Sequence, residues 1–261
     1  MEYLKKVENI KEDTLWNIPE QKQGVVAVVG GNSQNFRTSI RVAEFLGAKF
    51  PLRDVKVILP DALKNKLPPL DNFTFLDSTD SGSFKGGEEI LSATENADYI
   101  LAIGDLSKNS ITTQEISRFF KKTQKPLIIT RDAVDILSER ADESTLMHEN
   151  LIIFGSMIQI SKLFQSVFYP KMLLLSQPLT MIAESIHKFT LSYPVSIITF
   201  HNNHILIAKN GNINIIPLEK TQYSAITIWS GELAAKIAAL NLYNPNNFLD
   251  ATAAAIISAQ H

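Results

Sequence analysis

A carboxylate at the start of a predicted helix is the first candidate for chemistry in this sequence. Glu232 follows Ser230 and Gly231 and opens an alanine-rich segment, residues 231–242, whose composition favours a closely packed helix. Free backbone N–H groups and the positive end of the helix dipole at such a position bind an anion such as phosphate. A carboxylate beside that anion can serve as a general base. The alternative is that Glu232 only complements the helix dipole in the first turn.

Further candidates directly follow predicted strands, which is where open α/β sheets bind their ligands. Gly31 and Asn32 follow the first strand, and the glycine pair before Asn32 permits either close backbone approach to a ligand or simply a tight turn. Asp105 follows a later strand and either meets a ligand or caps the helix that begins near Thr112. Asp132 likewise either contacts a ligand or caps the helix that follows it.

Cysteine and histidine offer little further chemistry. The chain has no cysteine, which excludes disulfides, thiolate nucleophiles and cysteine zinc sites. His201 and His204 flank a predicted turn and could pair on a metal, but no carboxylate stands near them, so we expect solvated loop residues. We therefore predict no metal site.

Short apolar runs alternate with longer segments of helical periodicity along most of the chain. The runs lack polar alternation, which indicates strands buried on both faces, at residues 25–29, 55–59, 99–103, 127–129, 151–154 and 195–200. The predicted helices among them include residues 39–48, 113–122, 156–167 and 178–191. This alternation predicts the α/β class, with a mostly parallel sheet covered by helices.

The pattern changes in the last quarter of the chain. Two apolar runs, residues 205–208 and 213–216, flank Asn210 and Gly211, a pair typical of hairpin turns. We therefore expect an antiparallel hairpin at one edge of the sheet. Because the chain shows no repeat, linker or shift in composition, a single domain over residues 1–261 is predicted.

The composition excludes several classes of function. Of the 261 residues, 45% are hydrophobic and 20% charged, which suits a globular protein and excludes fibrous and disordered classes. A formal net charge of −2 is too small to favour nucleic acid or an anionic membrane as a partner. No apolar run approaches the roughly 20 residues that span a bilayer, and the charged start does not resemble a signal peptide. We expect a cytoplasmic protein with a small-molecule ligand.

Four segments form an ordered set of motifs. They are Ile18-Pro19 with Lys22 and the strand and turn over residues 24–32, then residues 102–106, 125–134 and 230–234. In order and spacing they resemble the ribokinase-like superfamily, most closely its ADP- or ATP-dependent NAD(P)H-hydrate dehydratase branch. The resemblance covers nearly the whole chain. It implies a three-layer α/β/α fold and the dehydration of hydrated NADH or NADPH, coupled to nucleotide hydrolysis.

The resemblance also implies roles for the candidate residues. Glu232 is the expected catalytic base. The residues expected to bind ADP or ATP, with or without Mg²⁺, are Thr227, Ser230, Gly231 and Gly104. The residues expected near the NAD(P)H-hydrate substrate are Gly31, Asn32 and Asp132. Relatives in this superfamily often form homo-oligomers, so the resemblance favours such an assembly here.

The sequence departs from that branch at the site itself. Trp229 stands where the family has a glycine whose amide approaches phosphate, and Glu232 stands where it has an aspartate. Phe154 and Met157 lie in a segment that carries a histidine and an acid in the family. Two alternatives therefore stay open: a catalytically degenerate ligand-binding or scaffold protein on the same fold, and a small-molecule kinase of the same superfamily.

Overall fold

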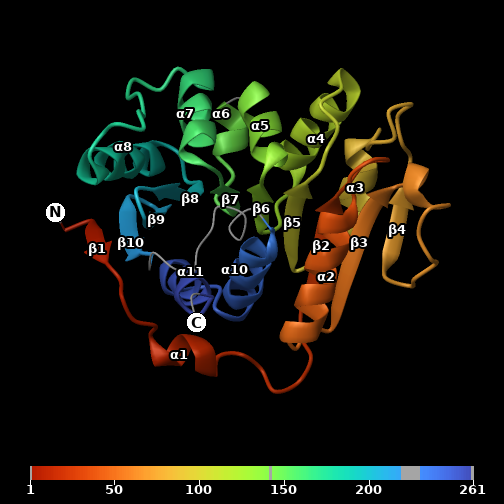
Figure 1. Ribbon diagram of the computed structural model, residues 1–261, viewed down its shortest axis with the longest axis horizontal. Helices are drawn as coiled ribbons and strands as arrows, with labels where there is room; N and C mark the ends of the chain where they lie inside the picture. The colour runs from red at the N-terminus through yellow and green to blue at the C-terminus, as the bar shows by residue number, and fades with distance from the viewer. Residues whose placement is uncertain (1, 141–142, 219–229, 260–261) are drawn as a thin grey trace.

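A ten-stranded sheet forms the centre of the computed structural model, which describes residues 2–140, 143–218 and 230–259 (Figure 1). Its strand order is β1-β10-β9-β8-β7-β6-β5-β2-β3-β4. The strands are β1 Leu4–Lys6, β2 Val25–Gly30, β3 Asp54–Pro60, β4 Phe73–Leu76, β5 Tyr99–Gly104, β6 Leu127–Thr130, β7 Leu151–Phe154, β8 Ser196–His201, β9 His204–Lys209 and β10 Asn212–Pro217. Strand β9 runs antiparallel to both of its neighbours, and the other neighbouring pairs are parallel.

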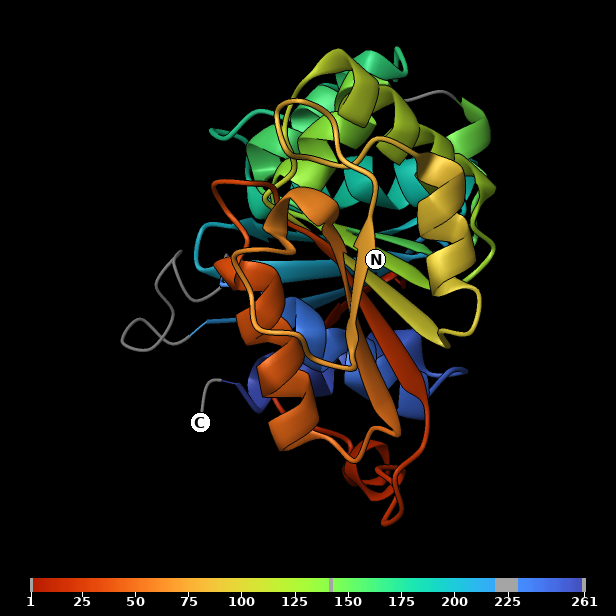
Figure 2. The ribbon, with the colours of Figure 1, turned by 90° about the vertical axis from the view of Figure 1, so that its right-hand side faces the viewer.

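Helices cover both faces of this sheet, and Figure 2 shows them stacked on its two sides. One layer consists of α3 Gly87–Thr94, α4 Ser110–Lys122, α5 Asp132–Glu139, α6 Glu143–Leu146, α7 Met157–Ser166 and α8 Leu179–Ser192. The other consists of α2 Arg37–Lys49, α10 Glu232–Tyr243 and α11 Phe248–Ile257. The short helix α1 Glu12–Trp16 packs beside α11. The three-layer α/β/α architecture expected from the sequence is confirmed.

The apolar strands supply both hydrophobic cores. Along β2, Val25, Ala27 and Val29 face the core under α4, α5, α7 and α8. Val26 and Val28 face the core under α2, α10 and α11. Successive side chains of a strand point to opposite faces, so a strand buried on both faces must be apolar at every position.

Small residues let α10 and α11 lie close to the sheet and to each other. The alanines of both helices are buried, namely Ala234, Ala235, Ala238, Ala239, Ala251, Ala253, Ala254 and Ala255. Their side chains add little bulk between backbones, which confirms the close packing expected from the sequence.

The predicted hairpin is β9 and β10. Asn210 and Gly211 at its turn have φ of 50° and 76°, and positive φ at both central residues is the geometry of a type I′ turn. The hairpin does not itself form the edge, because β1 pairs in parallel with β10 outside it. Strand β1 has three residues, two of them lysines, and so gives no strand pattern in the sequence.

Candidate functional site

The chain reverses its direction across the sheet between β2 and β5, which are hydrogen-bonded neighbours. After β2 it continues to β3 on one side, and after β5 it continues to β6 on the other. The connections at the carboxyl ends of these strands diverge, and such a switch point is where open α/β sheets bind ligands. We call this region the carboxyl edge, comprising residues 31–36, 105–109, 131–132 and 230–232.

Asn32 ties two connections of the carboxyl edge together. Its Oδ1 accepts hydrogen bonds from the backbone N–H groups two and three residues further on, at 2.9 and 3.0 Å. Its Nδ2 donates to the backbone oxygen of Asp105 at 2.6 Å. The neighbouring Gly31 has φ of 101°, and its N–H donates to Gly104 O at 3.1 Å. The amide of Asn32 is therefore engaged within the protein and holds the loop after β5.

An ion pair joins the ends of β5 and β6. Arg131 Nη2 lies 2.6 Å from Asp105 Oδ1, and Arg131 Nη1 donates to Thr38 Oγ1 at 3.0 Å. The Arg131 and Asp105 side chains are 27% and 12% exposed, so water and salt screen this pair less than a surface pair. Asp105 and Arg131 both have positive φ, 57° and 58°. Non-glycine residues held in such conformations are strained, and they cluster at functional sites.

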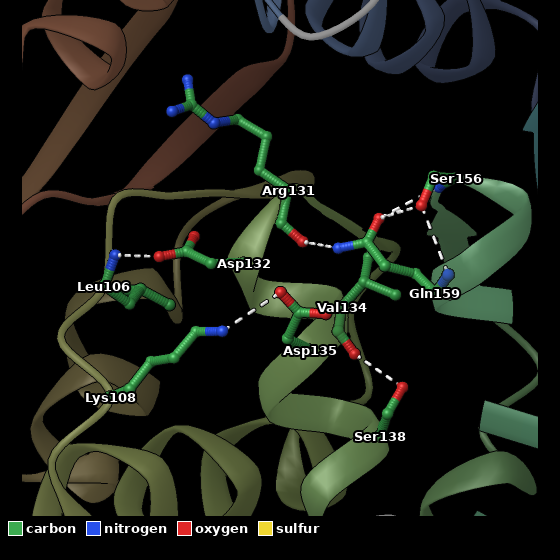
Figure 3. Close-up of polar contacts among 9 residues, drawn as sticks. All are labelled: Leu106, Lys108, Arg131, Asp132, Val134, Asp135, Ser138, Ser156 and Gln159. Carbon is green, nitrogen blue, oxygen red and sulfur yellow. Dashed lines mark hydrogen bonds and ion pairs between the residues drawn. The ribbon is translucent and has the colours of Figure 1, made fainter. Parts of the chain in front are cut away.

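A glutamine of α7 helps to hold Arg131 in its strained conformation. Arg131 has ψ of −134° together with its positive φ, a combination that favours glycine. Gln159 Nε2 donates to the backbone oxygen of Arg131 at 2.8 Å (Figure 3). Gln159 is itself fixed by a capping box with Ser156 at the start of α7. The turn between β6 and α5 is thus braced from the next connection along the sheet.

Asp132 is the first residue of α5, and its carboxylate is only partly satisfied. Oδ2 accepts from the Leu106 N–H at 2.9 Å, whereas Oδ1 is buried and makes no hydrogen bond in the described part of the chain (Figure 3). Burial raises the pKa of Asp132 to about 6. The charge of Asp105 adds to this rise, while nearby backbone N–H groups and the Arg131 guanidinium oppose it. An aspartate with this pKa can accept or donate a proton close to neutral pH.

Because Gly104 has no side chain, the Asp132 carboxylate can lie directly against it. A Cβ on Gly104 would lie 2.2 Å from Asp132 Oδ1, closer than real Cβ contacts come. Gly104 also has φ of 88°, which residues with a side chain rarely adopt. Both the backbone conformation and this close approach therefore require glycine here. A contact between Gly104 and a nucleotide stays a prediction.

The start of α10 contacts the end of β5 from the layer that holds α2, α10 and α11. Gly231 has φ of 88°, and a Cβ there would lie 2.6 Å from Ile103 Cδ1. Arg41 of α2 donates from Nη2 to Ser230 O at 2.7 Å, and its Nε lies 3.5 Å from Glu232 Oε1. The Glu232 N–H donates to Ser230 Oγ at 3.3 Å. Backbone N–H groups of a first helical turn beside a guanidinium form a donor set that suits phosphate oxygens.

The structure decides between the alternatives left open for two aspartates. Asp105 does not cap α4, because Asn109 does so, accepting from the Thr112 N–H at 2.8 Å. Asp132 lies inside α5 rather than at its cap, and its carboxylate bonds to Leu106 instead. Each carboxylate therefore bonds to a residue in the loop after another strand: Asp105 to Arg131 after β6, and Asp132 to Leu106 after β5. Thr227 and Trp229 lie outside the described residues.

Two arginines of this region were missed by sequence reasoning. Arg131 and Arg41 make their polar contacts with partners in other elements of the fold. The only local signal is that Arg131 directly follows a predicted strand.

The expectation for one histidine was wrong. His201 ends β8 and is 3% exposed, with Nε2 3.1 Å from Gln177 O, so it is a buried residue rather than a solvated one. His204, across the turn, is partly exposed and pairs its Nδ1 with Asn202 O at 2.7 Å. Across residues 2–140, 143–218 and 230–259 no group of three or more histidine, aspartate or glutamate side chains is arranged to hold a metal ion.

Solved structures share this architecture. The chain superimposes on a ribokinase-like superfamily protein of Enterococcus faecalis with a TM-score of 0.68 and 18% identity, covering 100% of this chain and 87% of that one. For the ADP/ATP-dependent NAD(P)H-hydrate dehydratase of Bacillus subtilis the TM-score is 0.63 and the identity 13%, with 95% and 85% covered. This chain has the ribokinase-like fold.

The solved structures that share this fold include both a dehydratase and a kinase. A pyridoxal kinase of Staphylococcus aureus, solved with AMP-PCP and pyridoxal, matches with a TM-score of 0.52 and 11% identity, covering 92% of this chain and 86% of that one. The Bacillus dehydratase was co-crystallised with ATP and Mg²⁺. No protein-family model and no curated sequence matches the chain. Function must therefore be argued from the site. In the described ranges, no helix is long and apolar enough to cross a membrane.

Proposed function

We propose that this protein is a nucleotide-dependent enzyme of the NAD(P)H-hydrate dehydratase type, which uses ADP or ATP to dehydrate hydrated NADH or NADPH. One observation carries the proposal: two unlike groups border the end of β5. They are the start of α10, where Arg41 contacts Ser230 and the Glu232 carboxylate, and a buried aspartate, Asp132, with a raised pKa. The motif order in the sequence and the fold shared with a dehydratase support it.

The start of α10 would hold the nucleotide phosphates. Ser230 and Gly231 lie at the positive end of the α10 helix dipole, which favours an anion, and Arg41 adds a positive charge there. Glu232 carries a negative charge at this helix start, and Arg41 neutralises that charge in part. A bound ADP or ATP would supply the phosphoryl group that converts the substrate hydroxyl into a phosphate ester, with AMP or ADP as the other product. Loss of that phosphate and of a ring proton, with formation of the ring double bond, would complete the dehydration.

Glu232 and Asp132 would have separate roles toward the substrate. Glu232 would take the proton of the substrate hydroxyl as general base, with Arg41 orienting its carboxylate. Asp132 would lie beside the substrate and, through its bond to the Leu106 N–H, hold the loop after β5 in place. Asn32 has its amide engaged, so its part would be to position the loop that carries Asp105.

One observation favours a second candidate, a non-catalytic ligand-binding protein. The polar groups of the carboxyl edge largely satisfy one another, since Arg131 holds Asp105, and Arg41 holds both Glu232 and Ser230. A site with this degree of internal pairing can bind a nucleotide without the freedom to transfer a proton.

Calorimetric titration and an activity assay together test the proposal. We expect ADP or ATP to bind, and NADH absorbance to return when either is added with hydrated NADH. Arg41→Met should weaken nucleotide binding by about tenfold or more, because it removes a charged partner of phosphate. Arg37→Met is the matched control on the same helix, since Arg37 is exposed and lies outside the site.

The possible outcomes separate the candidates. Binding without turnover would support the ligand-binding protein, and phosphate transfer to an alcohol such as a vitamin precursor would support a kinase. Failure of every nucleotide to bind the folded protein would overturn the proposal.

A further inference from the structure

Two adjoining pockets lie at the opposite end of the sheet from the carboxyl edge. The first, of about 200 Å³, lies where β5, β6 and β7 begin and is bordered by Tyr99, Ile152, Leu242 and Phe248. The second, of about 320 Å³, lies at the start of α11. Lys209, Pro245 and Phe248 border both pockets, so the two lie side by side.

Lys209 is a cation without an acidic partner at this site. It is half-buried, its Nζ lies 4.9 Å from the centre of the Phe248 ring, and no carboxylate of the described residues forms an ion pair with it. Burial lowers the pKa of Lys209, and the charge of Glu149 opposes this only in part. The acids that border the pockets have other partners: Asp98 accepts from the Val25 N–H, and Asp250 pairs with Lys11. An anionic ligand would therefore find Lys209 available.

Asn241 contributes a buried acceptor that lacks a donor. It is 5% exposed and borders the first pocket. Its Nδ2 donates to Ile237 O at 2.9 Å and to Thr252 Oγ1 at 3.0 Å, which fixes the orientation of the amide. Its Oδ1 is buried and makes no hydrogen bond in the described part of the chain. A buried unpaired acceptor is unfavourable, and a ligand with an N–H or O–H donor would satisfy it.

The start of α11 adds further donors for an anion. Residues 247–250 border the second pocket, and the side chain of Asn247 does not cap the helix. The first backbone N–H groups of a helix have no partner within the helix, and the helix dipole there favours negative charge. Lys209 and the start of α11 therefore both border the second pocket, where each favours a negative charge.

We propose that these pockets bind a small carboxylic acid with an apolar, flat body and one N–H or O–H donor. The carboxylate meets Lys209 at the start of α11. The apolar body fills the space beside Tyr99, Ile152 and Leu242, and the donor reaches Asn241 Oδ1. This site is separate from the carboxyl edge, so its ligand is neither the nucleotide nor the substrate of the proposed reaction.

Calorimetric titration with a matched set of probes tests the proposal. The probes are the 2-, 3- and 4-hydroxybenzoates, benzoate, which lacks the donor, and 4-hydroxybenzamide, which lacks the charge. We expect at least one hydroxybenzoate to bind with a Kd below about 1 mM. Benzoate and 4-hydroxybenzamide should bind more weakly by about tenfold or more, because each leaves one buried group unsatisfied.

Two variants attribute the binding to this site. Lys209→Met should weaken hydroxybenzoate binding by about tenfold or more, and Lys209→Gln serves the same purpose if the first variant folds poorly. Glu232→Gln, at the other end of the sheet, should leave it unchanged. The proposal is overturned if no hydroxybenzoate binds the wild type, or if both Lys209 variants bind as tightly as the wild type.

Discussion

The two ends of the central sheet are built differently. At the carboxyl edge, Asp105 and Arg131 have positive φ, and Asp132 keeps a buried carboxylate oxygen that makes no hydrogen bond in the described part of the chain. The segments that lead into β5, β6 and β7 at the amino end, residues 95–98, 123–126 and 147–150, contain no residue with positive φ. The backbone thus enters these strands relaxed and leaves β5 and β6 strained.

This difference indicates that backbone strain lowers the stability of the fold at the carboxyl edge. Strained backbone persists only where its surroundings enforce it, and here the Asp105–Arg131 ion pair and the Gln159 amide do so. Nothing in the packing of parallel strands requires positive φ where β5 and β6 end but not where they begin. Substitutions at the carboxyl edge should therefore change activity, stability and pH dependence in ways that substitutions at the amino end do not.

The largest expected effect is on turnover. Glu232→Gln should lower the rate of NADH recovery by ~10²–10⁴-fold, because a general base matters only in the transition state. The melting temperature and the affinity for nucleotide should change little, because Glu232 is 40% exposed and its contact with Arg41 is a surface pair. Wild-type turnover in this variant would remove Glu232 from the mechanism.

The next largest effect is on folding stability. Gly104→Ala should lower the free energy of unfolding by about 2–4 kcal/mol, because it strains the backbone and drives a Cβ into the Asp132 carboxylate. Gly47→Ala is the matched control on the exposed side of α2, where a Cβ meets nothing within 4 Å. It should raise stability by about 0.5–1 kcal/mol.

Denaturant unfolding of both glycine variants measures these changes. In an Asp132→Ala background the cost of Gly104→Ala should shrink, since the carboxylate that the new Cβ meets is gone. Equal costs in the two backgrounds would show that the backbone alone requires glycine at position 104.

Asp132→Asn should change how stability depends on pH. Burial raises the folded-state pKa from 3.8 to about 6, so between these values the folded state binds a proton that the unfolded state has released. The free energy of unfolding of the wild type should thus fall by about 1–3 kcal/mol as pH rises through 6. The variant lacks this fall, so it should be more stable than the wild type at about pH 8, and the advantage should vanish near pH 4.

Denaturant unfolding at several pH values measures this difference. Asn150→Ala, at the amino end of β7, is the control from the relaxed end of the sheet, because Asn150 is exposed and its side chain makes no hydrogen bond in the described chain. Its effect should stay within about 0.5 kcal/mol at every pH. A parallel pH dependence for Asp132→Asn and the wild type would contradict a raised pKa.

The smallest expected effect concerns the strain at Arg131. Arg131→Gly and Arg131→Ala both lose the ion pair with Asp105, but only glycine adopts φ of 58° and ψ of −134° without strain. We expect the glycine variant to be the more stable of the two by about 1 kcal/mol in denaturant unfolding. At Arg140, the residue that follows α5 and has φ of −127°, the order should reverse. Greater stability of the alanine variant at position 131 would show that no strain is stored there.

Much of the fold could be predicted from the sequence because its signals are local. The apolar runs at residues 25–29, 99–103 and 151–154 all became strands with bounds within one residue of those expected. The hairpin followed from Asn210 and Gly211, since a type I′ turn needs residues that accept positive φ. The sequence also located the main site candidates, because strand ends meet at one edge of a parallel sheet.

The contacts within the site could not be predicted, because they join residues far apart in the chain. Arg41 reaches Ser230, and Asn32 reaches Asp105. Strand β1 is a similar case, since Leu4 pairs with Ile213 and nothing near Leu4 in the sequence indicates a partner. Such pairings depend on how distant segments of the chain pack together in the folded protein.

Asp132 shows the boundary between the two kinds of information. The sequence by itself determined that an aspartate follows a buried strand, at the edge where ligands bind. Only the tertiary structure decided that one carboxylate oxygen bonds to the Leu106 N–H while the other is buried against Gly104. A pKa depends on the water and charges around the group, and here distant segments of the chain exclude the water. The chemistry available to Asp132 is therefore set by packing rather than by its place in the sequence.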